Sequence, residues 1–201
     1  MVSTDATLHT EVAGALNELV WEIGMSKTLI VFHSRTGNTR RIAQALARRL
    51  GADLDEVRIV QPLGGAIGYT FCAIEAVAGL MPALLPSRKD PAEYDLVVIG
   101  TPVWFWSLSS PMRSWLAQHP MKHSRVAFFG TMGGSGAPRV FATMATLLGK
   151  RPVATLALTD AQVAAGANDQ LDAFAQQLHV RRAPTRTRAA KRSRATKHAI
   201  A

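Results

Sequence analysis

The chain alternates short apolar runs with segments of helical periodicity, and this alternation constrains its fold most strongly. The runs at 28–32, 95–100 and 125–130 are apolar at nearly every position. Strands that face water on one side alternate apolar and polar residues, so these runs indicate strands covered on both faces. The β-α-β-α-β order therefore predicts an α/β fold with a doubly wound parallel sheet between two layers of helices.

The remaining elements complete this pattern. Further strands are expected at 54–60 and 153–158, and helices at 39–50, 111–118, 140–148 and 167–178. The segment 64–85 begins with glycines, and 70–79 has a helical pattern. It occupies the place of the second crossover helix between parallel strands.

Composition divides the chain of 201 residues into three regions. Residues 25–180 form the predicted domain. Residues 1–24 are acidic with apolar residues at helical spacing, so they are either a helical extension or precede a true start at Met25. Residues 181–201 carry eight Lys and Arg and no acid, and we expect them to be disordered. This tail either is solvated without a partner or contacts nucleic acid or anionic lipid.

Several classes of protein are disfavoured. No run of about 18 apolar residues is present, so no transmembrane segment is predicted. The N-terminus lacks the pattern of a secretory signal, which makes a cytoplasmic location the expectation. The single cysteine, Cys72, rules out an intramolecular disulfide and argues against a cysteine-ligated metal. His119 and His123 have no accompanying carboxylates that would indicate a metal site or a catalytic triad.

A polar segment lies between the first strand and the first helix of the domain. It consists of Ser34, Arg35, Thr36, Gly37, Asn38 and Thr39. Hydroxyl and amide donors beside the N-terminus of a helix favour binding of a phosphate, and Gly37 allows close approach of the backbone. The alternative is an ordinary helix-capping loop. Arg35 either adds positive charge or points to solvent.

The stretch 29–40 (LIVFHSRTGNTR) resembles the phosphate-binding loop of flavodoxins, in which Thr/Ser-x-Thr-Gly-Asn-Thr follows the first strand. It lacks the lysine of a nucleotide-triphosphate P-loop and the G-x-G-x-x-G of dinucleotide folds. The resemblance covers about residues 26–180. It implies a flavodoxin-like five-stranded sheet of order 2-1-3-4-5 and flavin mononucleotide (FMN) as cofactor.

A second motif follows the strand at 95–100. It consists of Thr101, Pro102, Val103, Trp104, Phe105 and Trp106. Ligands of open α/β sheets bind at the carboxyl ends of strands, and three neighbouring aromatic residues there suit stacking on a flat ring. The resemblance implies that they enclose one side of the isoalloxazine ring, with Trp104 the first choice. The alternative is packing in the core or an interface.

A third motif follows the strand at 125–130. It consists of Thr131, Met132, Gly133, Gly134, Ser135 and Gly136. The resemblance implies that this loop contacts the pyrimidine side of the flavin, whereas the alternative is a generic flexible loop. His33, at the end of the first strand, is interpreted as structural.

Three functions remain open. The first is electron transfer through FMN to a redox partner protein or a small acceptor such as a quinone. The second is an FMN-dependent NAD(P)H:quinone oxidoreductase, favoured because no glycine follows Trp106 closely, unlike in electron-carrier flavodoxins. The third is a flavin-binding regulator without catalysis. No residue is assigned a catalytic role.

Overall fold

The computed structural model describes residues 27–60, 81–121 and 123–180. The predicted N-terminal extension, the helix expected at 70–79 with Cys72, and the basic tail lie outside these residues. None of the helices in the described ranges is both long and apolar enough to cross a membrane.

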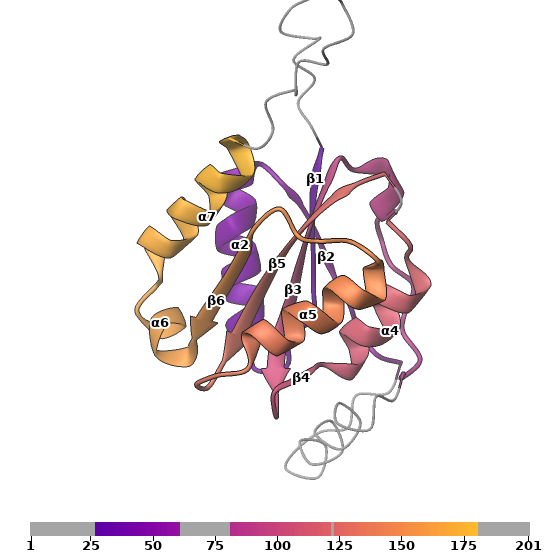
Figure 1. The fold of residues 1–201 in the computed structure, drawn as a ribbon, viewed down its shortest axis with the longest axis horizontal. Coiled ribbons are helices and arrows are strands. Elements are labelled where there is room, and N and C mark those ends of the chain that lie inside the picture. Colours follow the sequence, from indigo (N-terminus) through magenta and orange to yellow (C-terminus); the bar gives the residue numbers. More distant parts are fainter. Residues whose placement is uncertain (1–26, 61–80, 122, 181–201) are drawn as a thin grey trace, which may run out of the picture.

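A parallel sheet forms the centre of the domain (Figure 1). Its parallel strands are β1 (Thr28–Phe32), β2 (Asp53–Glu56), β3 (Leu96–Trp104), β5 (Arg125–Met132) and β6 (Thr155–Thr159). They lie in the order β2-β1-β3-β5-β6, which confirms the predicted order of five parallel strands. A two-residue strand, β4 (Ser107–Leu108), pairs antiparallel with the end of β3 and was not predicted.

Helices cover both faces of the sheet, as predicted (Figure 1). The helices packed on one face are α2 (Asn38–Leu50), α6 (Asp160–Ala164) and α7 (Asn168–Val180). The helices packed on the other face are α4 (Ser110–Gln118) and α5 (Ala137–Leu148). A short 3-10 helix, η1 (Pro91–Glu93), precedes β3. The five-residue α6 was not predicted because it is shorter than two helical turns.

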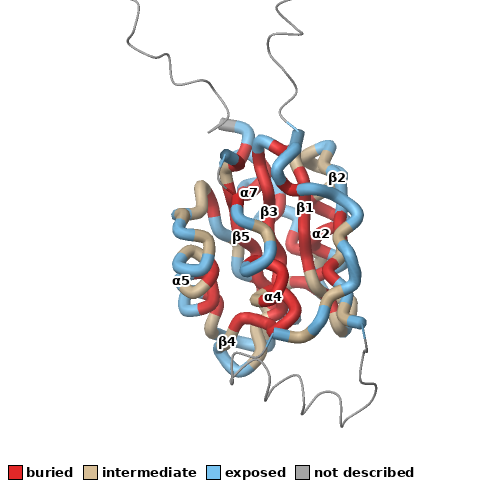
Figure 2. The backbone as a smooth tube through the Cα atoms, turned by 90° about the vertical axis from the view of Figure 1, so that its right-hand side faces the viewer, coloured by how far each residue is buried: buried red, intermediate tan, exposed pale blue. Residues whose placement is uncertain are grey.

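The side chains of the strands alternate between two hydrophobic clusters. In β3, Val97 and Ile99 join the cluster beneath α4 and α5, whereas Leu96 and Val98 join the cluster beneath α2 and α7. All four are buried, and Figure 2 shows β1, β3 and β5 as the buried centre of the domain. This two-sided burial explains why the central strands β1, β3 and β5 are apolar at nearly every position.

The second strand ends earlier than predicted. We expected it at 54–60, but β2 ends at Glu56. Residues 58–60 instead pair with 83–85, through bonds from Val60 N–H to Ala83 O at 3.1 Å and from Leu85 N–H to Arg58 O at 2.8 Å. Residues that change pairing partner stay extended, so the sequence pattern continues across the end of β2.

Candidate functional site

Three loops meet at one edge of the sheet. The strands β1, β3 and β5 are adjacent and parallel, so their carboxyl ends lie at the same edge. The three predicted motifs follow these ends, although β3 and β5 extend through Trp104 and Met132 and include the first residues of their motifs. The structure therefore brings together the segments 34–39, 101–106 and 131–136.

The N-terminus of α2 offers donors for an anion. Its N-cap is Gly37, at φ 97°, which forms no side-chain capping bond. Ser34 Oγ accepts from the backbone N–H of Arg40 at 3.1 Å, so it caps one group of the first turn and still has its own hydroxyl hydrogen to donate. Other N–H groups of a first turn have no acceptor within the helix. Together with the helix dipole, they favour an anion here.

Two predicted donors of the first loop bind other parts of the chain. Thr39 Oγ1 and Thr131 Oγ1 are 2.8 Å apart, and both side chains are buried. Asn38 Nδ2 donates to Asp160 Oδ1 at 2.8 Å. These bonds join the first loop to the third loop and to the start of α6. Thr36 is exposed and has no hydrogen-bond partner among the residues that the structure describes.

The second loop is a tight hairpin between β3 and β4. Val103 pairs with Leu108 and Trp104 with Ser107, which leaves a two-residue turn at Phe105 and Trp106. Both turn residues have positive φ, 48° and 56°, as a type I′ turn requires. Such a conformation is costly for bulky side chains, and residues held in it cluster at functional sites. Phe105 and Trp106 are also 53% and 56% exposed.

The hairpin contacts the third loop closely. Trp106 Nε1 donates to Ser135 Oγ at 2.9 Å. Gly136 has φ 111°, and a Cβ there would lie 2.9 Å from Trp106 Cδ1 and 3.1 Å from Val103 Cγ1. Between the two loops is a cavity of about 300 Å³, lined by Val103, Trp104, Phe105, Trp106, Gly133, Gly134 and Ser135. This volume lies at the lower end of the range for small-molecule sites.

We predict that Gly136→Ala displaces Trp106. The added methyl has no room and the positive φ disfavours alanine, so unfolding free energy should fall by about 1–3 kcal/mol. The indole fluorescence should also change as the bond to Ser135 is lost. Gly134→Ala is the matched control, because a Cβ at Gly134 has no neighbour within 4 Å and its φ is not positive. Equal effects of the two substitutions would contradict the close contact.

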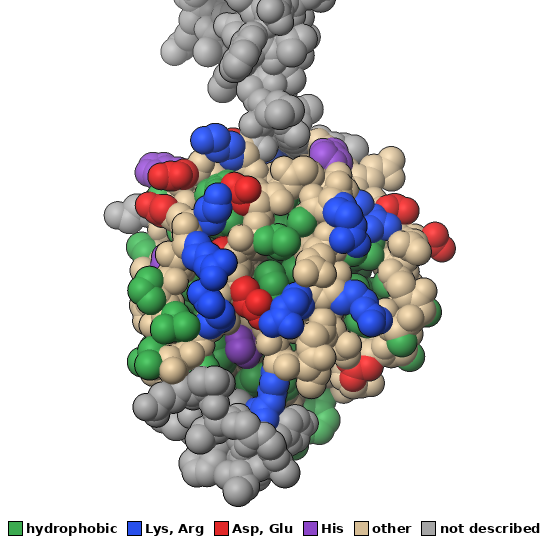
Figure 3. Space-filling model, turned by 180° about the vertical axis from the view of Figure 1, so that it is seen from behind, with side chains coloured by type: hydrophobic (Ala, Val, Ile, Leu, Met, Phe, Trp, Pro, Cys, Tyr) green, Lys and Arg blue, Asp and Glu red, His purple; other side chains and the backbone are tan. Residues whose placement is uncertain are grey.

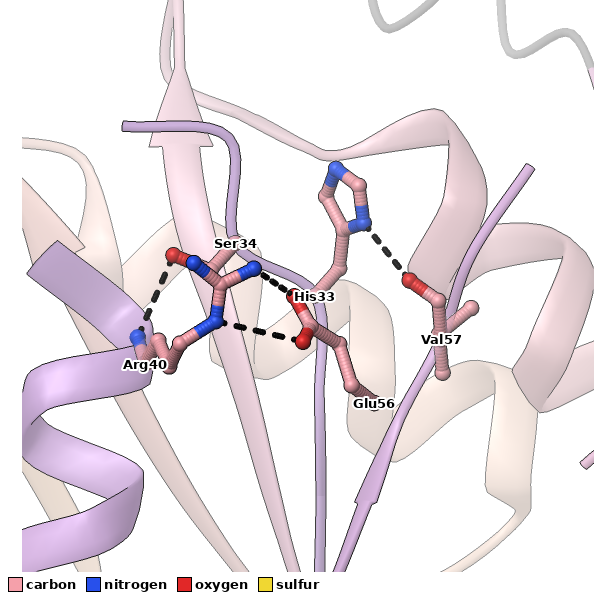
Figure 4. A network of polar contacts seen from close by, with 5 residues as sticks. All are labelled: His33, Ser34, Arg40, Glu56 and Val57. Carbon is pink, nitrogen blue, oxygen red and sulfur yellow. Dashed lines mark hydrogen bonds and ion pairs between the residues drawn. The ribbon is translucent and has the colours of Figure 1, made fainter. Parts of the chain in front are cut away.

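His33 lies beside the first loop, at the carboxyl end of β1. Its Nδ1 is 2.9 Å from the carbonyl oxygen of Val57 (Figure 4). Its ring stands perpendicular to Trp104, with 5.8 Å between the ring centroids. Next to it, Arg40 forms a two-point ion pair with Glu56, at 2.6 and 3.2 Å. Burial lowers the pKa of His33 below 6.5, although the bond to Val57 and the charge of Glu56 oppose this shift.

This lowered pKa predicts a pH dependence of stability. Below pH 6.5 the unfolded chain takes up a proton on His33 before the folded protein does, so acidification favours the unfolded state. The loss of stability due to His33 should be absent above pH 6.5. It should grow as the pH falls, until the pH passes the folded-state pKa. Denaturant unfolding of the native protein and His33→Asn, between pH 8 and 5, measures it as the difference between the two curves. A difference that does not change with pH would contradict it.

A family model described as flavodoxin matches residues 27–174. The chain belongs to the flavodoxin family. Among curated proteins, it is similar to proteins named NAD(P)H dehydrogenase (quinone) from Cupriavidus metallidurans and Nitrobacter winogradskyi, with 31% and 30% identity over 115 residues. Each match covers 55% of this chain and 55% of the relative, so the chain spans about half the length of these relatives.

Solved structures show the same fold. A flavoprotein from Lactobacillus acidophilus, solved in complex with FMN, aligns with a TM-score of 0.56 and 22% identity, over 71% of this chain and 99% of that chain. Oxidised flavodoxin 2 from Bacillus cereus aligns with a TM-score of 0.50 and 19% identity, over 78% and 99%.

One residue beside the three loops was not found from the sequence. Asp160 begins α6 and binds Asn38, and its carboxylate lies 3.9 Å from where a Cβ of Gly133 would be. It therefore lies between the first and third loops. The signal was present, because Thr159 and Gln162 form a capping box that marks the start of a helix directly after β6.

His119 is not part of this site. His119 stacks on Trp115 at 4.5 Å, and its Nδ1 is 2.9 Å from the Trp115 carbonyl oxygen at the end of α4. Within 27–60, 81–121 and 123–180, no group of three His, Cys, Asp or Glu side chains is placed to hold a metal ion.

Proposed function

We propose that this flavodoxin binds FMN at the junction of the three loops. The phosphate lies at the N-terminus of α2, where it accepts hydrogen bonds from first-turn N–H groups and from the hydroxyls of Ser34 and Thr36. The ring lies in the cavity between the aromatic hairpin and residues 133–135. The observation that carries the proposal is the convergence of an anion site and an aromatic-walled cavity at one sheet edge.

The described residues fit FMN. A phosphate monoester needs several donors and no metal, and the first turn of α2 contains no acidic residue that would repel it. The cavity combines aromatic rings with the backbone of Gly133 and Gly134, which allows a flat ring to approach the main chain. The FMN complex of the Lactobacillus acidophilus flavoprotein supports the same cofactor.

Bound FMN would supply reversible transfer of one or two electrons. The chain's residues then bind and orient the ring. Trp104 and the hairpin tip shield it from water. The carboxylate of Asp160, held by Asn38, adds negative charge beside the loops and disfavours further negative charge on a reduced flavin. We therefore infer that the protein transfers electrons through its flavin.

An FMN-dependent NAD(P)H:quinone oxidoreductase is the second candidate. It is favoured by the names of the relatives, which are about 30% identical to this chain over the matched part. These relatives are longer than the matched part.

If the protein is instead an electron carrier, its basic side chains constrain the partner protein (Figure 3). Helix α2 contributes the exposed Arg40, Arg41 and Arg48 and has no acidic residue, so a protein that docks there would need an acidic surface.

Two measurements test the proposal. Titration of FMN into the purified protein should quench flavin fluorescence and produce a protein-bound flavin spectrum with one FMN per chain. NADH or NADPH oxidation with a soluble quinone then separates the candidates, because turnover supports the oxidoreductase and reduction only through a partner reductase supports the carrier. A protein that takes up no FMN would refute both candidates.

A further inference from the structure

His33 connects the segment just after β2 to the aromatic hairpin. Its backbone N–H donates to Gly100 O at 3.2 Å, and its Nδ1 contacts Val57 O at 2.9 Å. Its ring meets Trp104 edge to face, at an interplanar angle of 89°. His33 is therefore held on two sides by the sheet, and its remaining side supports Trp104, the last residue of β3.

The contact with Val57 decides the tautomer. A backbone carbonyl oxygen can only accept, so Nδ1 carries the hydrogen and donates it. In the neutral ring Nε2 then has no hydrogen, and in Figure 4 it points away from Val57. Nε2 has no hydrogen-bond partner among the described residues.

Burial opposes a second proton on the ring, and the charged groups around it act in both directions. Arg35 and Arg40 disfavour a positive imidazole, whereas Glu56 favours it. Glu56 is already paired with Arg40, which weakens its effect on the ring. Burial disfavours the cation most. A protonated ring still donates Nδ1–H to Val57, but burial penalises its charge. It would gain by shifting toward water, which weakens its edge-to-face contact with Trp104.

We propose that neutral His33 is the positioning residue for Trp104, and that its protonation loosens the aromatic wall of the flavin site. The proposal rests on the proposed function, because it assigns Trp104 to the wall of that site. His33, which lies outside the three loops, would then support the Trp104 side chain in a pH-dependent way.

Two substitutions separate the two contacts of His33. His33→Asn places an amide N–H near the position of Nδ1, so it keeps a donor for Val57 but loses the ring against Trp104. His33→Phe keeps a ring against Trp104 but loses the donor. Neither side chain titrates. Riboflavin is the main probe, because the phosphate of FMN itself titrates near pH 6.

Riboflavin binding should depend on pH only where His33 is present. For the native protein, the dissociation constant should rise about fivefold from pH 7.5 to 5.5, in line with the loss of one aromatic contact. In both variants it should change less than twofold across this range. At pH 7.5, His33→Phe should bind riboflavin more tightly than His33→Asn, because it keeps the ring that supports Trp104.

If a variant fails to fold, a measurement on the native protein alone still tests the proposal. The ring protons of His33 should titrate by NMR with a midpoint below pH 6.5, and the indole N–H of Trp104 should shift with the same midpoint. Tighter riboflavin binding at low pH would overturn the proposal, since it would mean that a cationic His33 attracts the Trp104 face. A native-like pH profile in both variants would also overturn it. Absence of any flavin binding by the native protein would instead refute the proposed function.

Discussion

Replacing Ser34 and Thr36 together by alanine should weaken FMN binding about a hundredfold, because two hydrogen bonds to a charged phosphate are lost, each worth about 1.5 kcal/mol. Ser34 is buried beside the first turn of α2, and Thr36 is exposed in the same loop. Neither residue lines the cavity proposed for the ring. Riboflavin, which lacks the phosphate, should therefore bind the variant as well as it binds the native protein.

Fluorescence titration with both flavins checks this prediction. The control variant is Thr143→Ala with Thr146→Ala, which removes two hydroxyls that bond to carbonyl oxygens within α5. It should leave the affinity for FMN unchanged. If the Ser34 and Thr36 variant loses FMN and riboflavin equally, or loses neither, the phosphate does not lie at the N-terminus of α2.

Gly100→Ala should lower the unfolding free energy by about 3 kcal/mol, because the core is already filled at this position. Gly100 in β3 pairs with Phe129 in β5, and a Cβ on Gly100 would overlap the Phe129 ring. Both strands are in the interior of the sheet, and Phe129 is fully buried. Neither the backbone nor the ring can move without disturbing the packing beneath α2 and α7.

Denaturant unfolding measures this effect, and a double-mutant cycle identifies its cause. Phe129→Leu in the Gly100→Ala background should recover part of the lost stability, whereas Phe129→Leu alone should destabilise the protein. Gly130→Ala is the matched control in the neighbouring strand, because its Cβ would meet Phe141 at an ordinary 3.4 Å. It should change the unfolding free energy by less than about 1 kcal/mol. Additive effects at 100 and 129 would show that the Phe129 ring is not the obstacle.

Local sequence was sufficient to predict the architecture. Burial on both faces favours apolar residues at nearly every position of a central strand, and amphipathic helices repeat every 3.6 residues. The strand at 28–32 and the helix before Gly51 are therefore recognisable without tertiary information. The order of the five parallel strands, which the resemblance to flavodoxins implied, is confirmed. The predicted end of β2 was wrong because residues 58–60 pair with 83–85 instead of with β1, without a change in residue type.

The site was predicted as three segments, and the tertiary structure decided their contacts. Thr39 was predicted to donate to a phosphate, but its hydroxyl forms a hydrogen bond with Thr131, which is distant in sequence. Phe105 and Trp106 carry no glycine or asparagine signal for a hairpin turn, so the positive φ of both residues is imposed by the packing of β4 and Gly136. His33 was interpreted as structural, and only the fold shows that it lies against Trp104.

The sequence by itself therefore determined which segments become strands and which become helices, and it indicated the loops that we propose for the phosphate and the ring. It could do so because periodicity and side-chain type are local properties. Tertiary structure alone decided which hydroxyls remain available, where Asp160 lies and what His33 supports. Those properties depend on pairs of residues up to 122 positions apart, as for Asn38 and Asp160. Such pairs meet only when the sheet register and the helix packing are complete.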